Sequence, residues 1–140
     1  MEASVNYLGV LIAAVASFIV GFLWHGPLFG KQWIKLMGIP QAEVDAMRAK
    51  GMGPMMPQMV AAFIQQLVMA FVLAHFALAW GATDLFGALQ LAFWTWLGFI
   101  ATVLLNGVLW EKRSVNLYLF NIVYHLAALI VMAVALAMFE

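Results

Sequence analysis

The residues of this chain whose types and spacing could do chemistry are a few polar side chains set inside long apolar stretches. Asn121, Tyr124 and His125 lie three and four residues apart in the last stretch, so one face of a helix would carry all three. Gln65 and Asn106 lie in two other stretches. Histidine titrates near neutral pH, and amide and hydroxyl groups form hydrogen bonds. Such a set could bind a solute or relay protons.

Four apolar stretches must position these side chains, and none of them contains Asp, Glu, Lys or Arg. The 140-residue chain is 67% hydrophobic and 9% charged, which is more apolar than a soluble domain can be. A helix of about 20 residues crosses a hydrocarbon core of about 30 Å. We therefore predict one all-α transmembrane domain, a four-helix bundle spanning residues 1–140, with helices at about 5–25, 59–80, 85–110 and 115–139 and a loop at about 26–58.

All Lys and Arg residues lie in two of the segments that connect these helices. They are Lys31, Lys35, Arg48 and Lys50 in the first loop and Lys112 and Arg113 before the fourth helix. By the positive-inside rule both segments face the cytoplasm, so both termini face the opposite side. We expect a multi-pass protein of a bacterial inner membrane, with an organelle membrane as the alternative. Lipid is then the first partner, and nucleic acid is not an expected one.

The first loop is predicted to contain two short helices. Gly26-Pro27 should break the first transmembrane helix, after which Trp33 and Lys31 fall on opposite faces of an amphipathic segment. This segment should lie on the membrane surface. Pro40 and Gly51 bound a second predicted helix, with acidic residues near its start and basic residues near its end.

Small residues recur at every fourth position of the first helix: Gly9, Ala13, Ser17 and Gly21. A face of small side chains lets another helix approach closely. This face could pack inside the bundle, or it could receive a second copy of the chain or another subunit.

A faint internal repeat links the two halves of the chain. Gly21-Phe-Leu-Trp24-His25 near the end of the first helix resembles Gly107-Val-Leu-Trp110-Glu111 at the end of the third. Two repeated helical hairpins would be related by a pseudo-two-fold axis along the membrane normal. The shared composition of apolar segments is the alternative explanation.

Two interpretations of the polar residues remain open. In the first, Asn106 bonds Asn121 or His125 and holds helices together, each bond contributing about 1 kcal/mol. In the second, these residues with Gln65 and Tyr124 line a vestibule open to the cytoplasm and reaching about 15 Å deep at His125. The predicted spans contain no carboxylate or lysine, which argues against proton-driven transport.

No metal, cofactor or enzymatic activity is expected. The chain has no cysteine, and its three histidines lie at different predicted depths. Met52, Met55, Met56 and Met59 offer thioethers that suit Cu(I), but a flexible apolar linker explains this cluster better because no Cys or His is near it in the sequence. The chain also contains no Gly-rich phosphate loop and no nucleophile beside a base.

Several motifs together resemble a known family. They are an Asn-Tyr-Leu opening, the segment from Gly21 to Trp33, the run Trp110-Glu111-Lys-Arg113, and Asn121 with Tyr124-His125. Over nearly the whole chain they are similar to the bacterial membrane proteins called domain of unknown function 1761. The resemblance implies four transmembrane helices and no particular activity. It also implies a structural corner at the inner interface, formed by Trp24, His25, Gly26, Pro27, Gly30, Lys31 and Trp33.

We expect a small transport or permeation module that acts as a homo-oligomer, because four helices enclose little space and the small-residue face invites self-association. The alternative is an accessory subunit without chemistry of its own, packed on a larger membrane complex.

Overall fold

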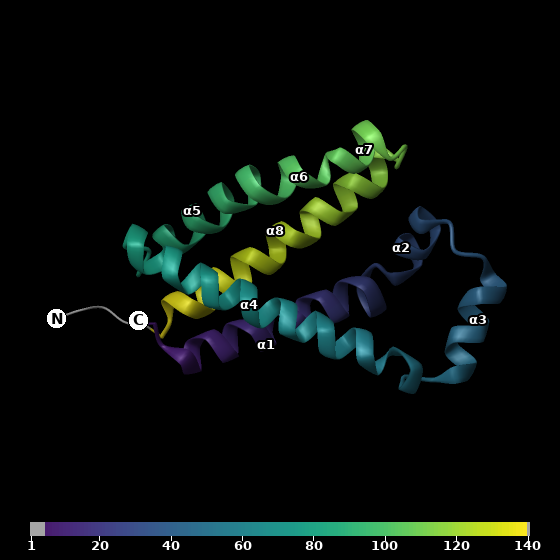
Figure 1. Cartoon of the computed structure of the whole chain (residues 1–140), viewed down its shortest axis with the longest axis horizontal. Coiled ribbons are helices and arrows are strands. Elements are labelled where there is room, and N and C mark those ends of the chain that lie inside the picture. Colours follow the sequence, from purple (N-terminus) through teal and green to yellow (C-terminus); the bar gives the residue numbers. More distant parts are fainter. Residues whose placement is uncertain (1–4, 140) are drawn as a thin grey trace.

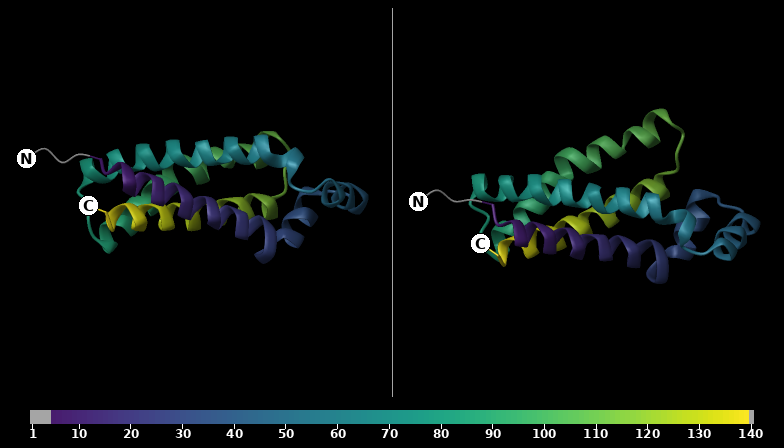
Figure 2. Two further views of the ribbon diagram at one scale, coloured as in Figure 1. Left: turned by 90° about the horizontal axis from the view of Figure 1, so that it is seen from below. Right: turned by 60° about the horizontal axis from the view of Figure 1, so that its bottom comes forward.

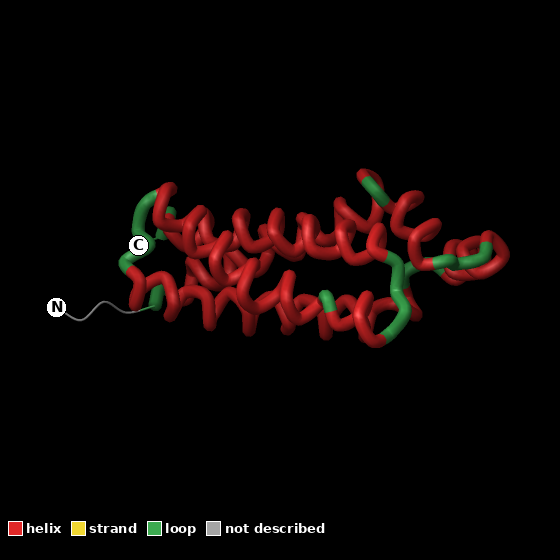
Figure 3. The backbone as a smooth tube through the Cα atoms, turned by 90° about the horizontal axis from the view of Figure 1, so that it is seen from above, coloured by secondary structure: helices red, strands yellow, loops and turns green. Residues whose placement is uncertain are grey.

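A computed structural model describes residues 5–139 of the chain. Within these residues the structure is helical and contains no strand (Figure 3). Four helical spans are long and apolar enough to cross a membrane: Tyr7–Leu28, Gly53–Trp80, Leu85–Trp110 and Val115–Ala137. The predicted all-α fold class, a four-helix membrane bundle, is confirmed.

The spans are built from shorter elements. In chain order these are α1 (Tyr7–Leu23), the π-helical turn η1 (Trp24–Leu28), α2 (Gly30–Met37), α3 (Gln41–Lys50), the 3-10 turn η2 (Gly53–Met55), α4 (Met56–Trp80), α5 (Leu85–Trp96), the π-helical turn η3 (Leu97–Ala101), α6 (Thr102–Leu104), α7 (Asn106–Trp110) and α8 (Val115–Ala137).

Local sequence explains where several helices begin and end. The side chains of Asn6, Asp84 and Ser114 accept hydrogen bonds from backbone N–H groups in the first turns of α1, α5 and α8. Gly38 and Gly81 end α2 and α4 with φ of 70° and 72°, the left-handed conformation that glycine adopts without a steric penalty. The two helices predicted in the first loop are confirmed as α2 and α3.

Two spans are less regular than predicted. The first continues past Leu23 through η1, where Pro27 has no N–H to donate and the Phe29 N–H reaches back to the Trp24 carbonyl oxygen at 3.1 Å. Gly26 has non-helical angles there, with φ of −117° and ψ of −105°. The third span was expected as a single helix but is divided at η3 and again at Leu105. In the second span, helix α4 begins at Met56, three residues before the predicted start.

Helix α8 lies at the centre of the bundle. It packs against α1 on one side and α5 on the other, while α1 also packs against α4. Helix α1 begins and α8 ends near the α4–α5 turn, and α2, α3 and the α7–α8 turn lie at the opposite end (Figure 1). Because all Lys and Arg residues lie in the segments at that opposite end, we call it the basic end. Helix α3 extends beyond the bundle there (Figure 2).

The hydrophobic core occupies the half of the bundle away from the basic end. Its buried residues include Ala13 and Ala14 of α1, with the set Ala70, Leu73, Ala74, Ala77, Ala88, Leu91, Ala92, Leu129, Met132, Ala133 and Leu136 from the other helices. Alanine predominates, so the helices approach closely in this half. The half nearest the basic end has fewer buried residues and contains the pockets described below.

The packing does not show the two-fold symmetry expected of equivalent hairpins. Helix α1 packs along α8, and the symmetry would place α5 equally close along α4. Instead the arm formed by α5, α6 and α7 diverges from α4 toward the basic end (Figures 1 and 2). Each hairpin packs on itself, but the pair of hairpins is asymmetric.

Candidate functional site

The small-residue face of α1 packs against α8. Gly9, Ala13 and Ser17 are buried, and a Cβ atom added at Gly9 would lie 2.9 Å from the Cβ atom of Phe139. A Cβ atom added at Gly21 would lie 2.7 Å from the Tyr124 hydroxyl oxygen. This face therefore serves packing inside the bundle. Three of its four residues are buried in the bundle, and Gly21 is half-buried.

Next to this seam, the family-like motif forms an aromatic corner with α8. The Trp24 ring centroid lies 4.6 Å from that of Phe29 and 6.0 Å from that of Phe120. The His25 ring meets Trp33 and Tyr124 edge to face, with centroids 5.6 and 4.7 Å apart. Trp24 is thus a packing residue of the bundle.

The rest of the motif sets the direction of the chain at this corner. A Cβ atom at Gly30 would lie 2.9 Å from the His25 carbonyl oxygen, so only glycine lets α2 begin this close to η1. Pro27, Gly30 and Lys31 border an open hollow on the outer side of the corner, which Arg48 of α3 also lines. The seven residues predicted as an interfacial corner therefore lie at one bend of the chain.

On another side of the corner, α1, η1, α2, η2, α4 and α8 border an open pocket of about 420 Å³, which we call the Gln66 pocket. Its polar side chains come from His25, Gln58, Gln65, Gln66 and Tyr124, and its larger apolar ones from Phe18, Phe22, Trp33, Met52, Met55 and Met59. No Asp, Glu, Lys or Arg is among the lining residues.

Gln66 is the deepest polar residue of this pocket. It is only 6% exposed, and its Oε1 atom has no hydrogen-bond partner among the described residues. It lies ten residues after the start of α4, or about 15 Å along the helix axis, which is half of a hydrocarbon core of about 30 Å. A buried amide oxygen without a partner loses the hydration it would have in water. A donor on a ligand would satisfy this atom once the amide turned its oxygen toward the pocket.

Four of the five predicted vestibule residues are divided between two pockets, and the fifth, His125, lines neither. Gln65 and Tyr124 line the Gln66 pocket. Asn106 and Asn121 line a separate pocket of about 380 Å³ between α7 and α8. His125 is half-buried beside Tyr124, with ring centroids 4.7 Å apart. The single vestibule expected from the sequence is therefore two cavities, because the central α8 has neighbours on both sides.

The hydrogen bonds between helices are made by residues other than those predicted. Among the described residues no hydrogen bond links Asn106 to Asn121 or His125. Instead the Trp96 indole N–H donates to the Ile122 carbonyl oxygen at 2.7 Å, and the Tyr118 hydroxyl donates to the Ala101 carbonyl oxygen at 2.6 Å. The aromatic donors Trp96 of α5 and Tyr118 of α8 thus join the third span to the fourth through backbone carbonyl acceptors.

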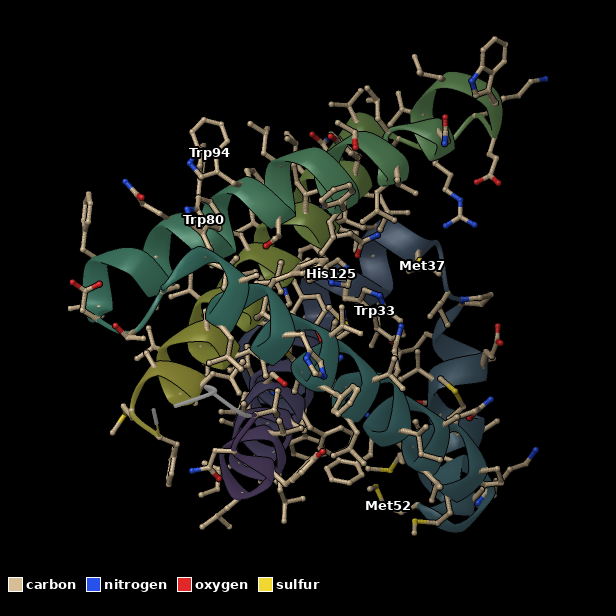
Figure 4. The ribbon with its side chains drawn as sticks, turned by 60° about the vertical axis from the view of Figure 1, so that its left-hand side comes forward. Trp33, Met37, Met52, Trp80, Trp94 and His125 are labelled. Carbon is tan, nitrogen blue, oxygen red and sulfur yellow. The ribbon has the colours of Figure 1, made fainter. Side chains whose placement is uncertain are left out.

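The methionine-rich linker contributes to the same pocket. Met52, Met55 and Met59 line it together with His25, so a histidine does lie near these thioethers in space although none is near them in the sequence. Figure 4 shows Met52 at the edge of the molecule and Trp33 and His125 toward its middle. His75 lines neither the Gln66 pocket nor the pocket between α7 and α8; its ring packs on that of Phe71, with centroids 4.6 Å apart.

Sequence reasoning singled out Gln65 and missed Gln66. Gln65 is exposed, whereas Gln66 shares the buried face of α4 with Ala70, Ala74 and Ala77. The spacing of four, eight and eleven residues from Gln66 to these alanines places them on one face. A stripe of alanines extended back by one turn was the signal that could have identified Gln66.

Comparisons with known proteins add the family. No curated protein and no solved structure matches the chain. A family model described as protein of unknown function (DUF1761) matches residues 8–137, which is nearly all of the chain and includes the aromatic corner and both pockets. The chain is a membrane protein that belongs to the DUF1761 family.

Proposed function

We propose that this protein is a small transport or permeation module, in which the Gln66 pocket admits a solute from the basic end. The observation that carries the proposal is the depth of the pocket. Its lining extends from Met52, in the loop before α4, to Gln66 in the middle of the second span. A pocket open at one surface with a free acceptor half-way across the membrane is what the binding step of a transporter requires.

The local backbone supports the same proposal. Two lining residues, His25 and Gly26, belong to η1, where the first span leaves regular helical geometry. In many transporters the substrate site is formed by interrupted membrane helices, and π-helical turns are frequent at functional sites. The pocket thus lies where the first span is most easily rearranged.

The residues that line the Gln66 pocket favour passage of a solute that is neither chemically converted nor coupled to protons. Coupling to a proton or sodium gradient usually relies on an intramembrane carboxylate, and the four spans contain no Asp or Glu. The residues that line the pocket also include no Ser, Thr, Cys or Lys. We therefore propose that a solute moves down its own gradient.

The transporting unit is proposed to be a homo-oligomer. None of the pockets found among residues 5–139 is lined by residues from both ends of the bundle, so one copy offers no continuous path. An apolar groove lined by Phe76, Thr95 and Phe99 separates α4 from α5 and could seat a helix of a second copy. The small-residue face of α1 no longer supports this proposal, because α8 covers it.

The oligomer is tested by the mass of the purified protein in mild detergent. A mass of two or more chains supports the proposal, and a monomer contradicts it. A stable complex with one different protein at fixed stoichiometry would favour the alternative function, that of an accessory subunit in a larger assembly.

The orientation is also a proposal. The basic end is expected to face the cytoplasm of a bacterium, because positively charged segments are retained on that side. The chain has no cysteine, so a single introduced cysteine is the only thiol. In intact cells an impermeant maleimide should label Asp84→Cys, at the opposite end, and spare Lys112→Cys. The reverse pattern would overturn the orientation.

Transport is tested by flux into vesicles that contain the protein. We suggest three uncharged probes of increasing apolar surface: glycerol, phenyl β-glucoside and 2-naphthyl β-glucoside. At least one should enter faster than into empty vesicles, and Gln66→Leu should slow that entry. Gln90→Leu is the matched control, since Gln90 is an exposed residue of α5 outside the pocket. Equal entry into empty and protein-containing vesicles for all three probes would contradict the proposal.

A further inference from the structure

We propose that the Gln66 pocket selects an uncharged, flat, largely apolar molecule that carries at least one N–H or O–H group, and that this group donates a hydrogen bond to Gln66 Oε1. The inference rests on the proposed function and names the class of solute. It follows from three features of the lining: its charge, the shape of its walls and the hydrogen-bonding capacity of its polar atoms.

The charge of the lining excludes ions. The pocket contains no acidic or basic side chain apart from His25, whereas Lys31 and Arg48 line the adjoining hollow, which shares His25 and Gly26 with the pocket. An ion that entered would lose its hydration without gaining a counter-charge, and that loss is far larger than any hydrogen bond could offset. The ligand is therefore uncharged.

The walls of the pocket suit a flat apolar body. Phe18, Phe22, Trp33 and Tyr124 present aromatic surfaces, against which planar molecules pack by stacked or edge-to-face contacts. Met52, Met55 and Met59 are flexible side chains that adapt to ligands of different outline. A volume of about 420 Å³ is within the usual range for small-molecule sites.

The buried pocket atom that lacks a hydrogen-bond partner among the described residues is an acceptor. Gln66 Oε1 is buried and has no partner among the described residues. His25 Nδ1 donates to the Gly21 carbonyl oxygen at 3.0 Å, so in a neutral ring Nε2 is left as an acceptor. A ligand with an N–H or O–H group would satisfy the Gln66 oxygen, whereas a hydrocarbon of the same shape would leave it unpaired.

The methionines allow a different ligand class, a soft monovalent metal ion bound by Met52, Met55, Met59 and His25. Thioethers and imidazole suit such ions. The orphaned amide oxygen of Gln66 does not, because soft ions prefer sulfur and nitrogen donors. The geometry therefore favours the uncharged organic ligand, and the metal ion is one outcome that the test must recognise.

Binding by the whole protein in lipid nanodiscs tests the inference. We suggest equilibrium dialysis with 2-naphthol, with 2-methoxynaphthalene, which has the same ring system but no donor, and with 2-naphthoate, which is charged. Empty nanodiscs give the partition into lipid that must be subtracted. The wild type should bind 2-naphthol most tightly and show no saturable binding of 2-naphthoate.

Variants distinguish the contribution of the Gln66 hydrogen bond to binding from that of the apolar walls. Gln66→Leu should weaken 2-naphthol binding about three- to tenfold, the effect of one lost hydrogen bond, and leave 2-methoxynaphthalene binding unchanged. Gln90→Leu should change neither. Gln66→Leu removes an unpaired buried polar atom, so its thermal unfolding should match that of the wild type; Gln66→Met provides a second variant if it does not.

Two results would overturn the inference. One is equal binding of 2-naphthol by the wild type and by both Gln66 variants. The other is silver ion binding that is lost when Met52, Met55 and Met59 are replaced by leucine, without binding of 2-naphthol. The outcome is distinguishable from that of the vesicle experiment: selective binding without flux contradicts only the transport function, and flux without donor selectivity contradicts only the inference.

Discussion

The α1–α8 seam and the α4–α5 seam would be equivalent if the two hairpins were related by symmetry, yet they differ. At the first seam, small residues of α1 let it pack closely along α8: Gly9 lies beside Phe139, just after the end of α8, and Gly21 lies beside Tyr124. At the second, α4 and α5 diverge and a groove lies between them. One seam is closed along its length, and the other opens toward the basic end.

The size of the facing side chains explains this difference. The closed seam has small residues at every turn of α1, so the helix backbones can approach. The open seam, between α4 and the span formed by α5 and η3, is lined by the larger residues Val72, Phe76, Phe99 and Ile100. Similar apolar composition therefore leads to different packing, and the pattern of residue size along one face decides which helices meet.

The largest effect is expected from filling the closed seam. Gly9→Leu would drive a side chain into Phe139 and should lower the free energy of unfolding by about 1–3 kcal/mol, the usual cost of overpacking. Gly98→Leu is the matched control on the diverging arm, where a Cβ atom meets nothing within 4 Å. Thermal unfolding in detergent measures both. Equal destabilisation by the two variants would show that side-chain size does not distinguish the seams.

A smaller effect is expected at the contact between α5 and α8. Trp96→Phe removes the indole N–H that donates to the Ile122 carbonyl oxygen at 2.7 Å and should cost about 1 kcal/mol. Trp94→Phe is the control, because Trp94 is 54% exposed on the outer side of α5 (Figure 4). If both variants unfold at the wild-type temperature, this bond does not contribute to the attachment of the arm.

The asparagines that were expected to join the helices should matter less. Asn121→Leu breaks no hydrogen bond with a described residue, so the free energy of unfolding should change by less than about 0.5 kcal/mol. Urea or thermal titration of the purified variant provides the measurement. A loss as large as that of Trp96→Phe would restore the interhelical bond predicted from the sequence.

The smallest effect is expected in the open groove. Phe99 is 68% exposed, so Phe99→Ala removes few protein contacts and should alter the free energy of unfolding by less than about 0.5 kcal/mol in the monomer. A variant that lowers the measured oligomer mass while leaving the monomer stable would place the contact between copies in this groove. An unchanged mass would move that contact elsewhere.

Much of the architecture could be predicted because its signals are local. Uninterrupted apolar runs predicted the spans, and Pro40 with Gly51 bounded α3. The predicted small-residue face of α1 is a real packing face, although only the structure shows that α8 covers it. The π-helical turn η3 was not predicted, because its only helix-weakening residue is Gly98 and single glycines are common in membrane helices.

The candidate site was predicted only in part. Tyr124 and His25 were singled out, but Gln65 was named in place of Gln66, and Asn106 and Asn121 were grouped with residues of another cavity. Depth along each helix can be counted from the sequence, whereas rotation about the helix axis cannot be known without the neighbours. Residues at similar depth therefore looked like one cluster although they face different helices.

What the sequence determined by itself is which segments enter lipid and which end of the bundle is basic, because hydrophobicity and charge act on each segment independently of its neighbours. Only the tertiary structure decided that Gln66 is buried with no partner for its Oε1 atom among residues 5–139, that His25 lines a pocket with the methionines, and that the two asparagines line another. These facts depend on which faces of α1, α4 and α8 meet. Which helix faces contact each other depends on packing between segments that are far apart in the chain.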